Sequence, residues 1–389
     1  MSALPSATAR VDRRASVAPW LGVLLMLMLT LNTLGGWVRL SGSGIAIPQW
    51  PLIHGSFLPP TTHAGWVMVR ADWEHHQADL RYKVSRGELN PGNLGREPSD
   101  DGDFQRMFFT EYGHRLLAAL SAVVLAGVLT VIFRDAYLRR RIGGPMAACA
   151  GLVVAQAVLG GLLVDQGTNT HFLFLHQGNS SLILGCILWS LLRLLDDARP
   201  QGTTAEVAAP RSLRRLLGVA AIATWIQLVL GALVAGSKFN APASGFGAWL
   251  QPLLWQGDRS WASNLLDNAA LLQGLHRIGA WFLVSMMLLC YWRASRHDIG
   301  DRLRLALQVS ATFIAIQVIL GISSLLVAGT GVGNALPLAH QLMGMCVFCS
   351  VVLCWYDARH ELARRGSMAA PAQPSPRDSL AGLVGGDRA

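Results

Sequence analysis

The sequence predicts an all-α integral membrane protein with eight transmembrane helices, arranged as two tandem four-helix bundles related by internal duplication. Three observations support this prediction. Hydrophobic residues make up 52% of the 389 residues and charged residues only 14%, a balance that indicates a membrane protein rather than soluble domains. Eight apolar runs are long enough to cross a bilayer. Four histidines also recur at matching places in the two halves of the chain.

Each of the eight expected spans is an apolar run with few charged residues. We place them at residues 18–38, 110–133, 145–164, 171–195, 213–236, 270–292, 304–328 and 334–356. The first run exceeds the apolar core of a signal peptide and has no clear cleavage site after small residues, so we interpret it as a retained helix.

The spans divide the chain into two bundles with flanking segments. In order, these are a cytoplasmic segment at 1–17, a first bundle at 18–199 with an outer loop at 39–109, a second bundle at 200–360 with an outer loop at 237–269, and a tail at 361–389. The tail is rich in Pro, Ala and Gly and is expected to be disordered and cytoplasmic. Tryptophans in both outer loops can anchor the protein at the membrane surface or cover the sites below them, and we favour anchoring.

Arginines predict the orientation of the chain in the membrane. They cluster before the first span and after every even-numbered span, whereas the short connections after the third and seventh spans carry almost no positive charge. Because cytoplasmic connections are enriched in Lys and Arg, both termini are expected in the cytoplasm. The net charge of +9 reflects this bias and the attraction of anionic lipid, and no nucleic-acid-binding motif accompanies it.

Four histidines are the main functional candidates: His114, His176, His276 and His340. They occur in the order His-Arg, His-Gln, His-Arg, His-Gln, each a few residues inside an even-numbered span. Those spans run inward from the outer side, which places all four roughly 6–9 Å deep. Histidine in a membrane helix is costly and usually faces the bundle interior. A polar interhelical contact could account for one such residue, but two matched pairs at one depth predict two haem sites with histidines on both faces of the iron.

A carboxylate marks only one of the two sites. Glu111 lies three residues before His114 and therefore shares its helix face, whereas Gln273 occupies the matching position in the second half. This asymmetry predicts one reactive site and one structural or electron-transfer site. The alternative for Glu111 is a charge near a helix N-terminus that is favoured by the helix dipole. Candidate contacts for haem propionates, with snorkelling as the alternative, are Arg39, Arg115 and Arg277.

An internal repeat supports the duplication. A Gln followed four residues later by a Gly occurs in the third, fifth and seventh spans, at Gln156 and Gly160, Gln227 and Gly231, and Gln317 and Gly321. The glycines permit close helix approach, and packing is their simplest role. All six cysteines lie in apolar spans, so Cys346 and Cys349 are expected to be packing residues despite their C-x-x-C spacing.

Six stretches together resemble the heme A synthase family, within a resemblance that covers residues 18–360. They are residues 34–44, 50–55, 108–115, 230–236, 275–277 and 340–341. The family oxidises the C8 methyl of heme O to the formyl group of heme A for cytochrome oxidase. The resemblance implies that His276 and His340 hold a resident heme b, that His114 and His176 bracket the substrate haem, and that Glu111 lies at the reactive site. Haem iron supplies an oxidising power that side chains lack.

The same resemblance implies a location and partners. It implies the bacterial inner membrane with haem sites toward the periplasm, heme O synthase and an electron donor as partners, and it leaves a homo-oligomer open. The chain lacks the outer-loop cysteine pair of some bacterial members and is more similar to the proteobacterial and mitochondrial branch, although residues 85–103 match only loosely. The alternatives are a diheme b-type electron-transfer cytochrome that oxidises quinol and an assembly protein that carries haem without chemistry.

Overall fold

The computed structural model describes residues 7–197, 209–237, 255–258, 260–326 and 334–368, and this part of the chain is helical with one isolated β-bridge between Ile53 and Ser56. Eight of its helices are long and apolar enough to cross a membrane. They are α1 (Ala7–Leu40), α3 (Asp101–Arg134), α4 (Ala136–Asp165), α5 (Thr170–Asp197), α6 (Arg211–Gly236), α8 (Ala269–Ser295), α9 (Asp301–Leu326) and α10 (Ala335–Met368). The predicted all-α class and the eight spans are therefore confirmed.

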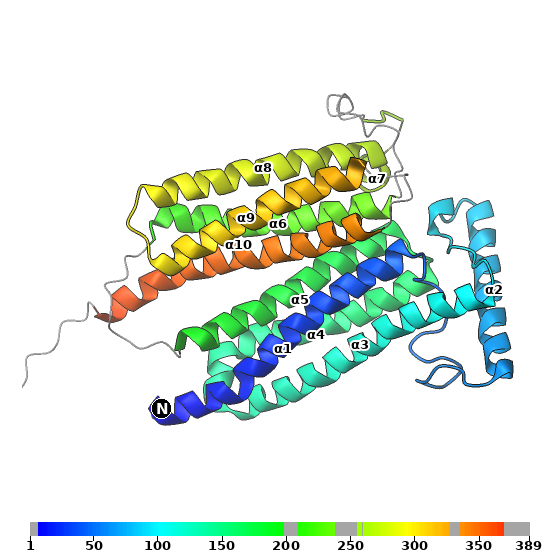
Figure 1. Ribbon diagram of the computed structural model, residues 1–389, viewed down its shortest axis with the longest axis horizontal. Coiled ribbons are helices and arrows are strands. Elements are labelled where there is room, and N and C mark those ends of the chain that lie inside the picture. Colours follow the sequence, from blue (N-terminus) through cyan, green and yellow to red (C-terminus); the bar gives the residue numbers. More distant parts are fainter. Residues whose placement is uncertain (1–6, 198–208, 238–254, 259, 327–333, 369–389) are drawn as a thin grey trace, which may run out of the picture.

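The long helices form two groups that lie side by side along the long dimension of the molecule (Figure 1). In the first group α1 packs on α3 and α5, and α4 packs on α5. In the second group α6 packs on α8 and α10, and α9 packs on α10. The two groups meet where α5 contacts α6 and where α10 contacts α1 and α5. The same order of neighbours in both groups is what a tandem duplication predicts.

Each group has its own apolar cluster. In the first group the cluster includes Leu21, Leu24, Ile142 and Leu184, and in the second it includes Leu213, Leu217, Leu303 and Tyr356, all with almost no exposed surface. Because lipid tails are as apolar as these side chains, the clusters stabilise the bundle by close packing rather than by exclusion of water. The six cysteines form no disulfide; Cys149, Cys290 and Cys354 are buried in these clusters and Cys349 packs against both, as the expected packing role requires.

Four helices extend well beyond the predicted spans, α1, α3, α4 and α10, and polar caps rather than hydropathy mark where α3 and α4 begin. α3 begins at Asp101, where the Asp100 side chain accepts a hydrogen bond from the Asp103 N–H. α4 begins at Ala136, where the Asp135 side chain accepts from two backbone N–H groups of the first turn. α10 continues to Met368, within the segment predicted as a tail, and residues 369–389 of that tail lie outside the described residues.

The first outer loop contains a helix that hydropathy did not predict. α2 (His63–Ser85) is polar on most sides, begins at a Thr62 cap, and lies across the outer end of the first group (Figure 1). Arg96, in the segment after α2, forms an ion pair of 2.7 Å with Asp103 of α3, and Arg70 lies over the Trp73 ring at 4.8 Å. Together with the short helix η1 (Pro91–Asn93), α2 forms a cap over the first group, which we call the outer cap.

The preference for membrane anchoring is wrong for the tryptophans of the outer cap. Trp73 is 2% exposed and packs against Phe104, while Trp66 lies edge-on to Phe108 with ring centroids 5.0 Å apart. These rings hold α2 against the first turns of α3, so the two tryptophans pack within the outer cap and do not anchor the protein at the membrane surface. Trp261, in the second outer loop, begins the short helix α7 (Trp261–Asp267) and is exposed as an anchor would be.

Candidate functional site

The four predicted histidines line one cavity. His114 comes from α3, His176 from α5, His276 from α8 and His340 from α10, and the cavity has a volume of about 1000 Å³. Ligand pockets usually measure about 300–1000 Å³, so this cavity is large enough for a bulky cofactor. Its lining comes from both helix groups and is mostly apolar. The structure therefore brings together all four residues that the sequence proposed as ligands.

Each of the four imidazoles lies against a glycine on a neighbouring helix. The distances from a Cβ atom built on the glycine to the ring Cε1 atom are 3.1 Å for Gly35 and His114, 3.5 Å for Gly160 and His176, 3.1 Å for Gly231 and His276, and 2.8 Å for Gly321 and His340. Three of these glycines end the Gln-x-x-x-Gly repeats. Their role is thus more specific than helix packing, because each makes room for a histidine ring.

The second pair of histidines has a geometry that fits a shared metal ion. The ring centroids of His276 and His340 are 6.4 Å apart, and their planes are inclined by 80°. Metal–imidazole bonds are about 2.0–2.1 Å long, so two imidazoles on opposite sides of one ion must hold their ring centres roughly 6 Å apart. Within the described residues no group of three or more His, Cys, Asp or Glu could hold a metal ion. This donor set suits an iron whose other ligands come from a porphyrin.

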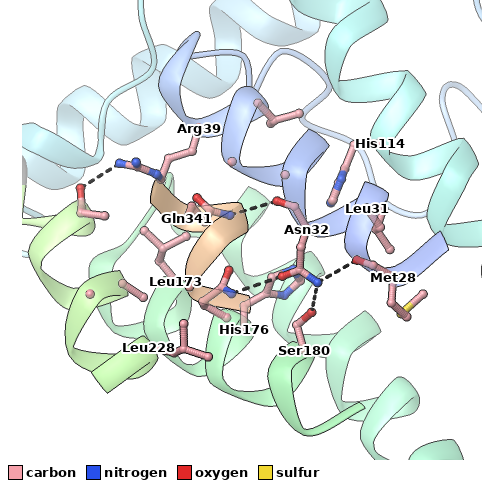
Figure 2. A pocket seen from close by; sticks show the side chains of 18 of the residues that line it. Met28, Leu31, Asn32, Arg39, His114, Leu173, His176, Ser180, Leu228 and Gln341 are labelled. Atoms are coloured by element: carbon pink, nitrogen blue, oxygen red, sulfur yellow. Dashed lines mark hydrogen bonds between the residues drawn. The ribbon is translucent and has the colours of Figure 1, made fainter. Parts of the chain in front are cut away.

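In the first pair, one nitrogen of each ring has no hydrogen-bond partner within the described residues. These atoms are Nδ1 of His114 and Nδ1 of His176, and both are buried. Buried polar atoms without a partner are rare in folded proteins. Figure 2 shows His114 and His176 on the cavity wall beside α1, whose Leu31 and Asn32 lie close to them.

Glu111 is held in a buried ion pair at the mouth of the first site. Its side chain is 4% exposed and lies 2.6 Å from Nη2 of Arg115, and it accepts a hydrogen bond of 3.0 Å from the Ile47 N–H. Because α3 begins at Asp101, Glu111 is well inside the helix, and the interpretation as a charge at the helix N-terminus is wrong. The matching Gln273 also lines the cavity, so the predicted difference in charge between the two sites lies at the cavity wall.

Arg115 is bound to protein groups. Besides Glu111, its guanidinium donates to the backbone carbonyls of Gln49 and Ile47, both at 2.5 Å. It therefore clamps the segment after α1 onto α3. Arg39 lines the cavity between the two groups, where it donates to the Ala235 carbonyl at 2.9 Å (Figure 2). Arg277 lines the cavity as well.

A polar bridge that the sequence analysis missed links the two pairs. Gln177 follows His176 and donates to Oδ1 of Asn32 at 3.2 Å, whereas Gln341 follows His340 and donates to the Asn32 carbonyl at 3.0 Å (Figure 2). Asn32 also donates to Ser180 at 2.8 Å. The signal in the sequence was an asparagine inside the first apolar span, where a polar side chain is costly without partners.

The remaining histidines lie away from the cavity. His171 lies 2.9 Å from Asp267 of α7. His54 lies 2.7 Å from Asp72, and His76 lies 3.0 Å from the Val164 carbonyl, both in or beside the outer cap.

Comparison with known proteins gives a consistent result. Residues 18–352 match the sequence model of the COX15-CtaA family, described as cytochrome oxidase assembly protein. The chain is 26% identical over 370 residues to the heme A synthase of Paracoccus denitrificans, covering 91% of each chain. It is 31% identical over 346 residues to the heme A synthase of Methylobacterium sp. strain 4-46, covering 86% of this chain and 89% of the relative. With that of Methylobacterium radiotolerans it shares 29% identity over 394 residues, covering 96% and 98%.

Proposed function

We infer that this chain, which belongs to the COX15-CtaA family of cytochrome oxidase assembly proteins, is a heme A synthase that oxidises the C8 methyl of heme O to the formyl group of heme A. Three relatives with 26%, 31% and 29% identity carry this name and are matched over most of their length. The observation that carries the inference is the convergence of two histidine pairs and one buried carboxylate, Glu111, on a single cavity.

We assign the two histidine pairs to different haems. His276 and His340 are the proposed axial ligands of a resident heme b, supported by their facing rings. His114 and His176 are the proposed ligands of the substrate heme O, supported by their place on the cavity wall beside Glu111. When bound, haem supplies the oxidising chemistry that side chains cannot perform on an unactivated methyl group. An apolar cavity between membrane helices suits the farnesyl tail of heme O.

Glu111 is the proposed acid–base group of the first site. The charge of Arg115 at 2.6 Å compensates the carboxylate in its apolar surroundings, and the Ile47 N–H fixes its second oxygen. A carboxylate held in this way can take up or release a proton at the cavity wall without moving. Arg115 acts as a positioning residue, so Arg39 and Arg277 are the better placed of the three proposed propionate contacts.

The chain is a multi-pass membrane protein, and we propose that it resides in the bacterial inner membrane with both termini in the cytoplasm. The start of α1 and the end of α10 lie at the end opposite α2 (Figure 1), which agrees with the arginine distribution. The outer cap and the haem sites then face the periplasm. Heme O synthase and an electron donor are the proposed partners, and a homo-oligomer is compatible with this arrangement.

Reporter fusions test this orientation. Fusions at Gly95, after α2, and at Gly257, before α7, are expected to report a periplasmic location, because both follow odd-numbered spans. A fusion at Gly300, between α8 and α9, is the matched control and should report the cytoplasm. A cytoplasmic signal from Gly95 or Gly257 would overturn the proposed placement of the four histidines.

Replacement of Gly321 by Ala tests the role of the glycines that face the histidines. The added methyl would lie 2.8 Å from Cε1 of His340, so the ring must turn away from its ligand position. We expect heme b occupancy to fall roughly tenfold, the effect of disturbing the groups that orient a metal-bound histidine. Gly127→Ala in α3 is the control, because its methyl meets no atom within 4 Å. Equal haem spectra for both variants would leave these glycines with a packing role only.

Heme A formation in a living cell tests the proposed function. The host should make heme O and lack its own heme A synthase, and its haems should be separated by chromatography. Expression of the chain is expected to convert heme O into heme A, and a His114→Ala variant is expected to abolish the conversion because the substrate iron is no longer held. Unchanged heme O at normal abundance of the wild-type protein would contradict the assignment.

A further inference from the structure

The two histidine pairs differ in how their rings are held. In the second half, the Gln227 side chain of α6 reaches α8, where its amide nitrogen lies 3.0 Å from Nδ1 of His276 and donates to the His276 carbonyl at 2.6 Å. When Nε2 of His276 binds iron, Nδ1 carries the proton, so the Gln227 amide must turn its oxygen to Nδ1 to accept from it and exchanges its bond to the His276 carbonyl for that one. His340 is held as well, because its Nδ1 lies 3.2 Å from the main-chain oxygen of Gln317 in α9.

The first half lacks these contacts. Nδ1 of His114 and Nδ1 of His176 have no hydrogen-bond partner within the described residues. Leu31 takes the place in α1 that Gln227 takes in α6, four residues before the glycine that faces the histidine. Gln156 takes the place of Gln317, but its side-chain oxygen accepts from Asn179 at 2.6 Å rather than turning to His176.

A second substitution makes room for the Gln227 amide. Gly279 lies three residues after His276, and a Cβ atom at Gly279 would collide with Oε1 of Gln227. The matching residue after His114 is Leu117, which carries the Cβ atom that Gly279 lacks. The second half therefore has a Gln and a Gly where the first half has two leucines, Leu31 and Leu117. Both changes are needed for the contact, which argues against a chance placement of one amide.

We propose that Gln227, with the space provided by Gly279, is a positioning residue that keeps the second haem in place, and that Leu31 and Leu117 leave His114 unfastened so that the first haem can leave. This inference rests on the proposed function, since a substrate site must release its product and a resident site must not. The physical basis is that metal-bound histidines usually bond through their second nitrogen, which fixes the ring and strengthens the ligand. Loss of such a partner typically weakens metal binding roughly 10–100-fold.

Loss of haem from the purified protein tests the proposal without an activity assay. The detergent-solubilised protein is mixed with an excess of an apo-globin, and transfer of heme b is followed by absorbance. We expect Gln227→Leu and Gly279→Ala each to release heme b roughly 10–100-fold faster than the wild type. Gln156→Leu is the matched control, since it makes the same change at a repeat position whose amide does not contact a histidine, and its heme b loss should equal that of the wild type.

The reverse substitutions, made in the first half of the chain, test the part of the proposal that concerns the first haem. A Leu31→Gln and Leu117→Gly double variant is expected to release heme A from the first site to the apo-globin roughly 10–100-fold more slowly than the wild type. If Gln227→Leu and Gly279→Ala fold and lose heme b at the wild-type rate, the proposal is wrong even where heme A is formed normally. If they lose heme b rapidly but no variant or wild type forms heme A, the holding role of Gln227 stands and the proposed function fails. Should Gln227→Leu and Gly279→Ala both fail to fold, the rate at which the double variant loses heme A decides. Loss at the wild-type rate would overturn the proposal.

Discussion

Replacing Glu111 by Gln is expected to stop nearly all heme A formation while heme b in the second half stays bound. The change is close to isosteric, and the one acceptor oxygen of a Gln side chain can keep either the bond from Arg115 or the bond from the Ile47 N–H, which hold Glu111 at 2.6 and 3.0 Å. The charge, the capacity to exchange a proton and one accepted hydrogen bond are lost. General acid–base groups contribute about 10²–10⁴-fold to a rate, so we expect a decrease of that order.

The measurement is chromatography of haems extracted from cells that supply heme O, at matched protein abundance. Heme O or a partly oxidised haem should accumulate in the Glu111→Gln strain. Glu74→Gln is the control, because it makes the same change on the exposed face of α2, where Glu74 pairs only with Arg70. Wild-type levels of heme A in the Glu111→Gln strain would remove Glu111 from the mechanism and leave it as an anchor for Arg115.

His276→Ala and His340→Ala are each expected to eliminate the low-spin spectrum of heme b. Their rings face each other with centroids 6.4 Å apart, and a single remaining imidazole cannot produce the spectrum of an iron with two histidine ligands. Heme A formation should fall in both variants if the second haem exchanges electrons with the first. His171→Ala is the control, because His171 pairs with Asp267 outside the cavity. Retention of the low-spin spectrum at normal occupancy in both variants would make the assignment of the resident site wrong.

Hydropathy was sufficient to predict the eight spans because an apolar run of bilayer length with few charges is typical of a helix that crosses a membrane. It was insufficient for α2, whose polar residues face outward on most sides while Trp73 and Leu80 pack inward. It also misplaced the start of α3, since that helix extends out of the apolar run and is capped by Asp100. Those features depend on tertiary contacts with the outer cap, such as the pair between Arg96 and Asp103, which lie outside any periodic pattern.

The candidate site was predicted in its main residues but not in their partners. The four histidines could be found because matched positions in a repeat restrict where the rings can meet, and the structure places all four on one cavity. The partners of Arg115 could not be predicted, because they are backbone carbonyls of an irregular segment, at Ile47 and Gln49. The bridge through Asn32 was also missed, since it depends on how the two groups dock and not on either repeat alone.

Mass analysis of the haem extracted from the purified wild-type protein tests the central claim most directly. The claim is that one histidine pair holds a resident cofactor and the other holds the substrate, so the two sites must contain chemically different haems. The expected result is heme b together with heme O or heme A. Heme b alone, at two equivalents per chain and in cells that make heme O, would contradict the claim and indicate a diheme electron-transfer cytochrome.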